Sequence, residues 1–230
     1  MRDKKLLRTA FVATLPVMAG YVVLGIGFGM ILKSKGYGIG WAFAMSFFIY
    51  AGSMQFVLVD LLTGGATLLT AAVTTLMVNA RHLFYSISMV EEYRGAGAKK
   101  PYMIFALTDE TYSLVCAGAP EGVNRHTYYF LVSVFDQIWW VGGCILGCIL
   151  GTALHFNTEG IDFALTALFL TVFVEQWLST KNHVSALIGV GASLLCLLIF
   201  GADSFLIPAM IAILVLLSCS WRKKGKEGAQ

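Results

Sequence analysis

The stretch GYVVLGIGFGMIL at residues 20–32 is similar to a second stretch, GGCILGCILGTAL, at residues 142–154. When the chain is shifted by 122 residues, nine of the 28 positions from 20 to 47 are identical, against roughly three or four by composition alone. Glycines at four-residue spacing also recur in unrelated membrane helices, so chance similarity is the alternative interpretation. A Gly-Ile pair at 38–39 and again at 160–161 favours a true repeat. We interpret the chain as two degenerate repeats, at about 8–118 and about 127–221, and leave open whether they are parallel or inverted.

The composition places these repeats in a membrane. With 58% apolar and 13% charged residues, and a mean hydropathy of +0.77, the chain has too much apolar surface for one soluble core. Most of its apolar segments approach the length of about 20 residues that a spanning helix needs. The eight segments are 10–32, 38–62, 66–90, 102–118, 127–154, 160–179, 183–200 and 203–221. We expect an all-α integral membrane protein of seven or eight transmembrane or re-entrant helices, some of them broken, in one polytopic domain over residues 1–230.

Basic residues at both ends of the chain predict its orientation. Cytoplasmic flanks of membrane helices are rich in Lys and Arg, so both termini are expected in the cytoplasm and the number of crossings to be even. The flanking residues are Arg2, Lys4, Lys5 and Arg8 at one end and Arg222, Lys223, Lys224 and Lys226 at the other. Residues 91–100 carry three further basic residues, yet they would lie outside if the first three segments all crossed. This conflict predicts that segment three or segment four is re-entrant.

Several other classes of function are disfavoured. The net charge of +3 is explained by the basic termini and gives no case for nucleic-acid binding. All five cysteines lie in or at the end of apolar segments, so we expect no disulfide. Cys144 and Cys148 share a helix face, but no His or further Cys stands at zinc-site spacing, so we expect neither a metal nor another cofactor.

Polar side chains inside the apolar segments are the candidate functional residues. A central Arg or Asp is opposed by about 2.5–3.5 kcal/mol in a membrane helix, so such residues usually face a cavity, a partner or a substrate. The polar groups are Gln55, Asn79 with Arg81 and His82, Asp109 with Glu110, Asp136, Asp162, Glu175 with Gln176, and Asp203, which the 122-residue offset sets opposite Arg81. A position at a helix end or a membrane interface is the alternative interpretation for Asp136, Asp162 and Glu175. We favour function for the clusters at 79–82 and 109–110 because each groups several costly side chains.

The chemistry of these groups predicts an amino-acid substrate. An arginine binds a carboxylate through a fork of donors, while Asn, Gln and the exposed backbone of a broken helix can hold the rest of the ligand. Titratable carboxyl groups, and His82, could carry a coupling proton. The predicted substrate-binding set is Gln55, Asn79, Arg81 and His82. The predicted set for proton coupling or ion pairing is Asp109, Glu110, Asp136 and Asp203.

Six strings, in this order, resemble the AzlC family, the large subunit of branched-chain amino-acid exporters. They are PVMAGYVVLGIGFG from residue 16, MSFFIYAGSMQF from 45, VNARHLFYS from 78, LTDETY from 107, DQIWWVGGCILG from 136 and GIDFALTALF from 160. The resemblance implies a secondary carrier in the cell membrane that exports leucine, isoleucine, valine and, as a further candidate, methionine. It also implies a small hydrophobic AzlD-type partner subunit. The family supplies no site residues here, so the two sets above rest on the physical argument alone.

Three rival functions remain open from the sequence. One is a channel or a structural membrane subunit, which would lack saturable transport. Another is a permease for a different small amphipathic solute. The third is a membrane-embedded hydrolase, which the absence of HExxH and GxSxG motifs disfavours, so we expect no enzyme activity.

Overall fold

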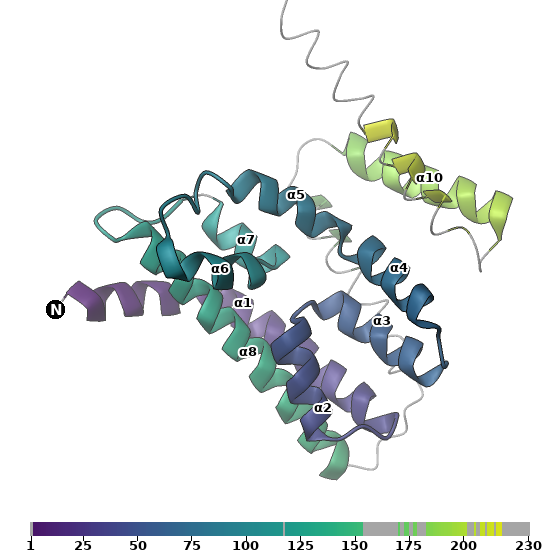
Figure 1. The fold of residues 1–230 in the computed structure, drawn as a ribbon, viewed down its shortest axis with the longest axis horizontal. Helices are drawn as coiled ribbons and strands as arrows, with labels where there is room; N and C mark the ends of the chain where they lie inside the picture. Colours follow the sequence, from purple (N-terminus) through teal and green to yellow (C-terminus); the bar gives the residue numbers. More distant parts are fainter. Residues whose placement is uncertain are drawn as a thin grey trace, which may run out of the picture. The chain divides into compact units, whose positions relative to one another are not determined.

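The computed structural model describes residues 2–116, 118–153, 170, 173–174, 177–178, 183–201, 205, 208–209, 211–213 and 215–217. Every element within these ranges is helical, and the chain divides into two compact units, residues 1–166 and 167–230 (Figure 1). Asp203 and the side chain of Arg81 lie outside the described part of the chain. So do Asp162, Glu175 and Gln176.

Two long helices form the scaffold of the first unit. Helix α1 (Arg2–Ser34) and helix α8 (Arg125–Ala153) lie side by side (Figure 1). Each contains a stretch long and apolar enough to cross a membrane, Lys4–Ser34 and Arg125–Thr152. Residue numbers at the contacts increase along both helices in the same direction: Gly143 of α8 lies against Tyr21 of α1, and Gly151 lies against Met30. The two helices therefore run parallel.

Glycines let the backbones of α1 and α8 touch. A Cβ added to Gly147 would overlap the backbone of Ile26, and one added to Gly29 would overlap that of Cys144. Only glycine permits so close an approach, which is the small-residue packing typical of membrane helices. The helices that the 122-residue offset relates therefore pack against each other, although the repeat itself stays a prediction.

The next segment folds back on itself as the first hairpin. It consists of α2 (Ile39–Ala44), the π-helix η1 (Met45–Ile49) and α3 (Gly52–Thr63). The backbone breaks at Tyr50, which has φ 45° and ψ 44°, the left-handed region. Before the break the Gln137 amide donates to the carbonyl of Phe47 at 3.0 Å, and after it Phe56 returns to Phe28, further along α1. The hairpin thus enters and leaves near the C-terminal ends of α1 and α8.

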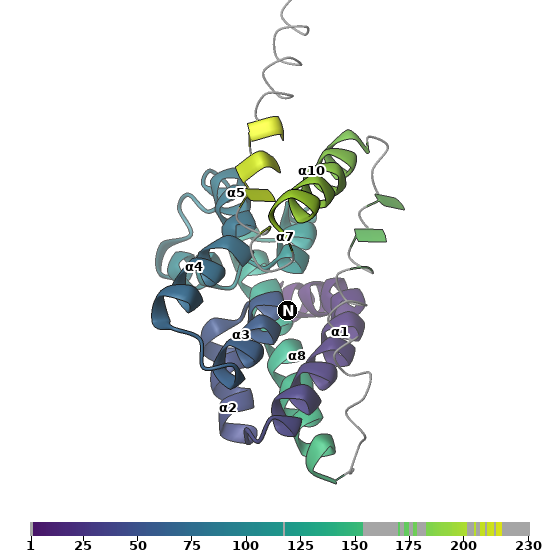
Figure 2. The same ribbon diagram turned by 90° about the vertical axis from the view of Figure 1, so that its right-hand side faces the viewer.

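Two collinear helices then carry the chain to the opposite end of this unit. Helices α4 (Leu68–Val78) and α5 (Ala80–Met89) meet at Asn79, and Figure 2 shows α2 and α3 toward one end and α5 toward the other. No residue of α4 is buried. In the second unit, α10 (Val184–Phe200) ends at Gly201, the position that the offset relates to Asn79.

A second hairpin enters from the opposite end of the unit. It runs through the 3-10 turn η2 (Gly97–Lys99) and α6 (Lys100–Phe105), bends at residues 106–108, and returns through α7 (Asp109–Val115). Lys99 contacts Thr127 near the start of α8, and Val115 returns to the same end, in a core cluster with Leu6 and Tyr128. Segment four therefore turns back, and residues 39–63 do the same, which nothing in the sequence indicated.

Residues 91–100 lie at the same end of the unit as the N-terminus. Arg125 Nη1 lies 3.4 Å from Glu92 Oε2, and the Tyr129 hydroxyl donates to that oxygen at 3.1 Å. Tyr93 is buried in the cluster that contains Leu6. The basic residues of this loop thus share an end with the basic N-terminus, so the conflict with the positive-inside pattern disappears.

Candidate functional site

The tips of the two hairpins meet beside the middle of α8. The rings of Tyr50 and Phe105, one from each tip, have centroids 6.2 Å apart. Gln137 of α8 joins the hairpins, because its amide nitrogen donates to the Phe47 carbonyl while its Oε1 accepts from the Tyr102 hydroxyl at 2.6 Å. We call this region the junction site; it comprises Tyr21, Tyr50, Gln55, Thr108, Glu110, Thr111, Asp136, Gln137 and Trp140.

Asp136 is the buried acidic group of the junction site. Its side chain is 0% exposed, and Oδ2 accepts a hydrogen bond from the Thr111 hydroxyl at 2.7 Å. Within the described part of the chain, Oδ1 has no hydrogen-bond partner. The Tyr50 hydroxyl lies near Thr111 and Asp136 but makes no hydrogen bond of good geometry to a described residue. A carboxylate with a vacant acceptor at this depth can take a cationic donor or a proton.

Gln55 is the second buried polar group with an unused atom. Trp140 Nε1 donates to Gln55 Oε1 at 2.8 Å, whereas Gln55 Nε2 has no partner among the described residues. Gln55 lies in the first turn of α3, where a helix presents unpaired backbone N–H groups and the positive end of its dipole. Position 52, the first residue of this helix, favours glycine because the Trp140 ring would lie 3.2 Å from a Cβ there. This corner of the site suits an anion.

A chain of hydroxyl groups connects Asp136 with Glu110. The Tyr21 hydroxyl donates to Glu110 Oε2 at 2.8 Å and lies 2.6 Å from Thr108 Oγ1. Thr108 donates to Thr111 Oγ1 at 3.1 Å, and Thr111 donates to Asp136. Thr108 is also the N-cap of α7, since its oxygen accepts from the Thr111 backbone N–H. The same two threonines thus end the break in the second hairpin and link the two carboxyl groups.

The residues predicted from the sequence are distributed over two places. Gln55, Glu110 and Asp136 come together at the junction site, although the sequence assigned Gln55 to a different set from the two carboxyl groups. His82 Nε2 lies 3.8 Å from Asp109 Oδ1, which connects α5 with α7. Asn79 marks the break between α4 and α5, and its Oδ1 is buried without a partner in the described ranges.

Sequence reasoning missed most of the uncharged members of the junction site. They are Tyr21, Tyr50, Thr108, Thr111, Gln137 and Trp140. Gln137 follows Asp136 directly in an apolar segment, which was an available signal. Tyr and Thr carry no comparable signal because both are common in membrane helices.

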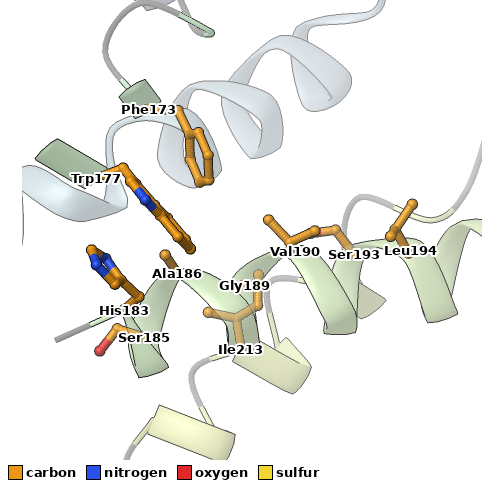
Figure 3. Close-up of a pocket in the computed structure, with 10 residues that line it drawn as sticks. All are labelled: Phe173, Trp177, His183, Ser185, Ala186, Gly189, Val190, Ser193, Leu194 and Ile213. Carbon is orange, nitrogen blue, oxygen red and sulfur yellow. The ribbon is translucent and has the colours of Figure 1, made fainter. Parts of the chain in front are cut away.

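The second unit contains a separate pocket of about 660 Å³. Figure 3 shows the Trp177 and His183 rings facing each other at its edge, with centroids 4.0 Å apart. Val190 and Leu194 of α10 contribute apolar side chains to its wall. Among its described lining residues there is no carboxylate, Lys or Arg, so it offers less to a charged solute than the junction site does.

Comparisons with known proteins agree with the resemblance in sequence. Residues 16–154 match the family model described as AzlC protein, a range that contains both hairpins and the whole junction site. The Bacillus subtilis (strain 168) protein named "Branched-chain amino acid transport protein AzlC" is 46% identical over 212 residues, covering 92% of this chain and 84% of that protein. An uncharacterized membrane protein of Helicobacter pylori is 37% identical over 221 residues, or 96% of each chain. The inner membrane protein YgaZ of Escherichia coli K12 is 26% identical over 214 residues, covering 90% of this chain and 85% of that protein. No solved structure matches. On the family match and the identity to these relatives, the chain belongs to the AzlC family.

Proposed function

We propose that the chain carries branched-chain amino acids out of the cell in exchange for protons, together with a small hydrophobic AzlD-type subunit. The name of the Bacillus subtilis relative supports the substrate class. The observation that carries the proposal is the meeting of two broken helices at a buried cluster with vacant acidic and amide atoms. Broken helices at mid-membrane are where secondary transporters bind substrate.

The junction site offers complementary groups for both charges of an amino acid. Asp136 Oδ1 receives the substrate ammonium, which is the donor that a buried carboxylate lacks. The N-terminus of α3 and the Gln55 amide receive the substrate carboxylate, as helix N-termini do for other anions. Arg81, whose side chain is not described, is the rival group for the carboxylate.

The two hairpins provide a way to expose this site to each side in turn. The first hairpin lies between the junction site and the C-terminal ends of α1 and α8, and the second lies between the site and their N-terminal ends. Movement of either tip would open the site to one side only. Alternating access of this kind is what distinguishes a carrier from a channel.

The burial of the site favours a carrier over a channel. Asp136 and Gln55 are 0% exposed and Trp140 is 3% exposed, so the described structure contains an occluded polar cluster at this place. An open channel would show a lining that solvent reaches.

Exchange of labelled leucine in proteoliposomes tests the proposal. Vesicles that contain the chain and its partner subunit are loaded with unlabelled leucine and diluted into labelled leucine. We expect saturable uptake, and its loss in Asp136→Asn, which removes the negative charge that attracts the ammonium. Asp60→Asn is the matched control, because Asp60 is an exposed carboxylate on α3. Uptake that rises linearly with leucine concentration would favour a channel, and full exchange by Asp136→Asn would remove the proposed site.

A further inference from the structure

We propose that Glu110 and Asp136 share one mobile proton, which passes between them through the hydroxyl groups of Tyr21, Thr108 and Thr111. This relay rests on the proposed function, for which it supplies the coupling step. Its five groups come from α1, from α7 with its cap, and from α8, so it crosses the packed centre of the first unit.

The geometry forms an unbroken series of hydrogen-bonding contacts. The four oxygen–oxygen separations from Glu110 to Asp136 are 2.8, 2.6, 3.1 and 2.7 Å. All four lie in or close to the normal range for O–H···O bonds. The three intermediate residues are buried, at 5%, 8% and 0% exposure, whereas Glu110 is half-buried. Protons can therefore pass along the series without bulk water entering it.

The series between Glu110 and Asp136 has one hydrogen too few for its contacts, so it can hold an additional proton. Three hydroxyl groups supply three hydrogens, but the series has four contacts. Thr108 and Thr111 direct their hydrogens toward Asp136, so Tyr21 must serve both Thr108 and Glu110 with a single hydrogen. A proton on Glu110 fills the deficit, because Glu110 then donates to Tyr21 and Tyr21 donates to Thr108.

Transfer reverses every bond in the series. The Glu110 O–H bond breaks as its proton bonds to the Tyr21 oxygen, the Tyr21 hydrogen moves to Thr108, and the Thr108 hydrogen moves to Thr111. The Thr111 hydrogen then bonds to Asp136 Oδ2. Glu110 ends as a carboxylate, Asp136 ends as a carboxylic acid, and each hydroxyl again holds one hydrogen. Thr108 keeps its cap on α7 in both states, since accepting from the Thr111 N–H uses a different lone pair.

The surroundings leave Asp136 free to change its charge. The titratable groups that act on it are Glu110 from α7, Tyr21 from α1, Tyr50 from the first hairpin, Tyr102 from α6 and Tyr128 of its own helix. No Lys or Arg is among these groups within the described chain. Glu110 in turn faces Tyr21, Tyr50 and Asp136.

This arrangement makes proton and substrate exclude each other. With the proton on Glu110, Asp136 is an anion and Oδ1 holds the substrate ammonium. With the proton on Asp136, the attraction is lost and the amino acid leaves. One proton therefore replaces one amino acid at the same carboxyl group, which is the requirement for exchange of the two across a membrane.

Tyr21→Phe is the sharpest test, because it removes one oxygen from the relay and keeps the ring against Trp140, 5.3 Å away. In the same proteoliposomes we would measure two rates, leucine exchange without a pH gradient and leucine movement driven by one. We expect gradient-driven movement to fall at least about tenfold further than exchange does, since relayed proton transfer is lost. Tyr112→Phe is the matched control: this tyrosine lies on α7, and its hydroxyl contacts Ser88 rather than the relay.

A second pair of variants separates the hydroxyl from packing. Thr111→Ser should retain gradient-driven movement, and Thr111→Val should lose it. Thr152→Val is the control, because the Thr152 hydroxyl bonds only to the Cys148 carbonyl of its own helix among the described contacts. Gradient-driven movement at the unsubstituted rate in Tyr21→Phe, or its equal loss in both Thr111 variants, would overturn the relay. Loss of exchange in the unsubstituted protein would instead overturn the proposed function.

Discussion

Gly147→Ala should destabilise the protein by forcing α1 and α8 apart. The new Cβ would lie 2.6 Å from Ile26 Cα and 2.7 Å from its carbonyl carbon, whereas ordinary contact begins near 3.4 Å. The Ile26 carbonyl oxygen lies closer still to the new Cβ, so the helices must separate locally by more than about 0.8 Å. Even a gap of that size forfeits a quarter to a half of each dispersion contact nearby. Overpacking of this kind costs about 1–3 kcal/mol. For a chain of this size, that corresponds to a midpoint about 2–12 °C lower in thermal unfolding.

Gly142→Ala provides the matched control for this measurement. It adds the same methyl group to the same helix, at a position where no described atom outside the neighbouring turns of α8 lies within 4 Å of the new Cβ. Both variants would be purified in one detergent with the partner subunit and unfolded thermally side by side. Equal midpoints for the two variants would refute the conclusion that backbone contact between α1 and α8 requires glycine.

Three further predictions concern the junction site and the path of the chain. Trp140→Phe removes the described hydrogen bond to Gln55, so thermal unfolding should report a loss of about 1–3 kcal/mol; an unchanged midpoint would show that Gln55 finds another partner. Gln55→Leu should raise the half-saturating leucine concentration in exchange assays at least about tenfold, and by more than Arg81→Ala does. A larger increase in Arg81→Ala would assign the substrate carboxylate to Arg81. A cysteine in place of Gly65 should react with an impermeant maleimide from outside the cell, whereas a cysteine in place of Ala98 should react only in inverted vesicles. Labelling of both from one side would contradict the conclusion that the two hairpins enter from opposite ends of the unit.

The long helices could be predicted from the sequence because their physical requirements are local. Apolar length identifies α1 and α8, and the glycines that the repeat aligned at 25, 29, 147 and 151 are among those that meet neighbouring atoms between these helices, together with Gly143, which the repeat did not align with a glycine. Gly20 and Gly142 also align, yet in the described part of the chain an added Cβ at either position would meet no atom of another element within 4 Å, so identity in the repeat does not always reflect packing.

The hairpins were harder to predict because each half of a hairpin is as apolar as half of a crossing. No proline marks the break at Tyr50 or the one at 106–108. The only available signal was the basic loop at 91–100, which indicated that some segment turns back without identifying residues 39–63.

The two carboxyl groups and Gln55 of the junction site could be found from their cost in a membrane, and the hydroxyl members could not. Asp136, Glu110 and Gln55 stand out in apolar segments. A Thr hydroxyl can satisfy itself within its own helix, as Thr152 does with the Cys148 carbonyl, so its presence in a sequence predicts no tertiary contact. The series from Tyr21 to Asp136 depends on contacts between residues up to 89 positions apart, which only the fold reveals.

The left-handed backbone at Tyr50 stores conformational strain at the tip of the first hairpin. A non-glycine residue in this region stores about 1–2 kcal/mol, which surrounding contacts must hold in place. Any movement of the tip that returns Tyr50 to right-handed geometry recovers this energy. The strain therefore makes the population of the moved tip about 5- to 30-fold larger than it would be in a hairpin with the same contacts and a relaxed backbone. Replacing Tyr50 by glycine would remove this strain, and the tip would then open less often for the same loss of contacts.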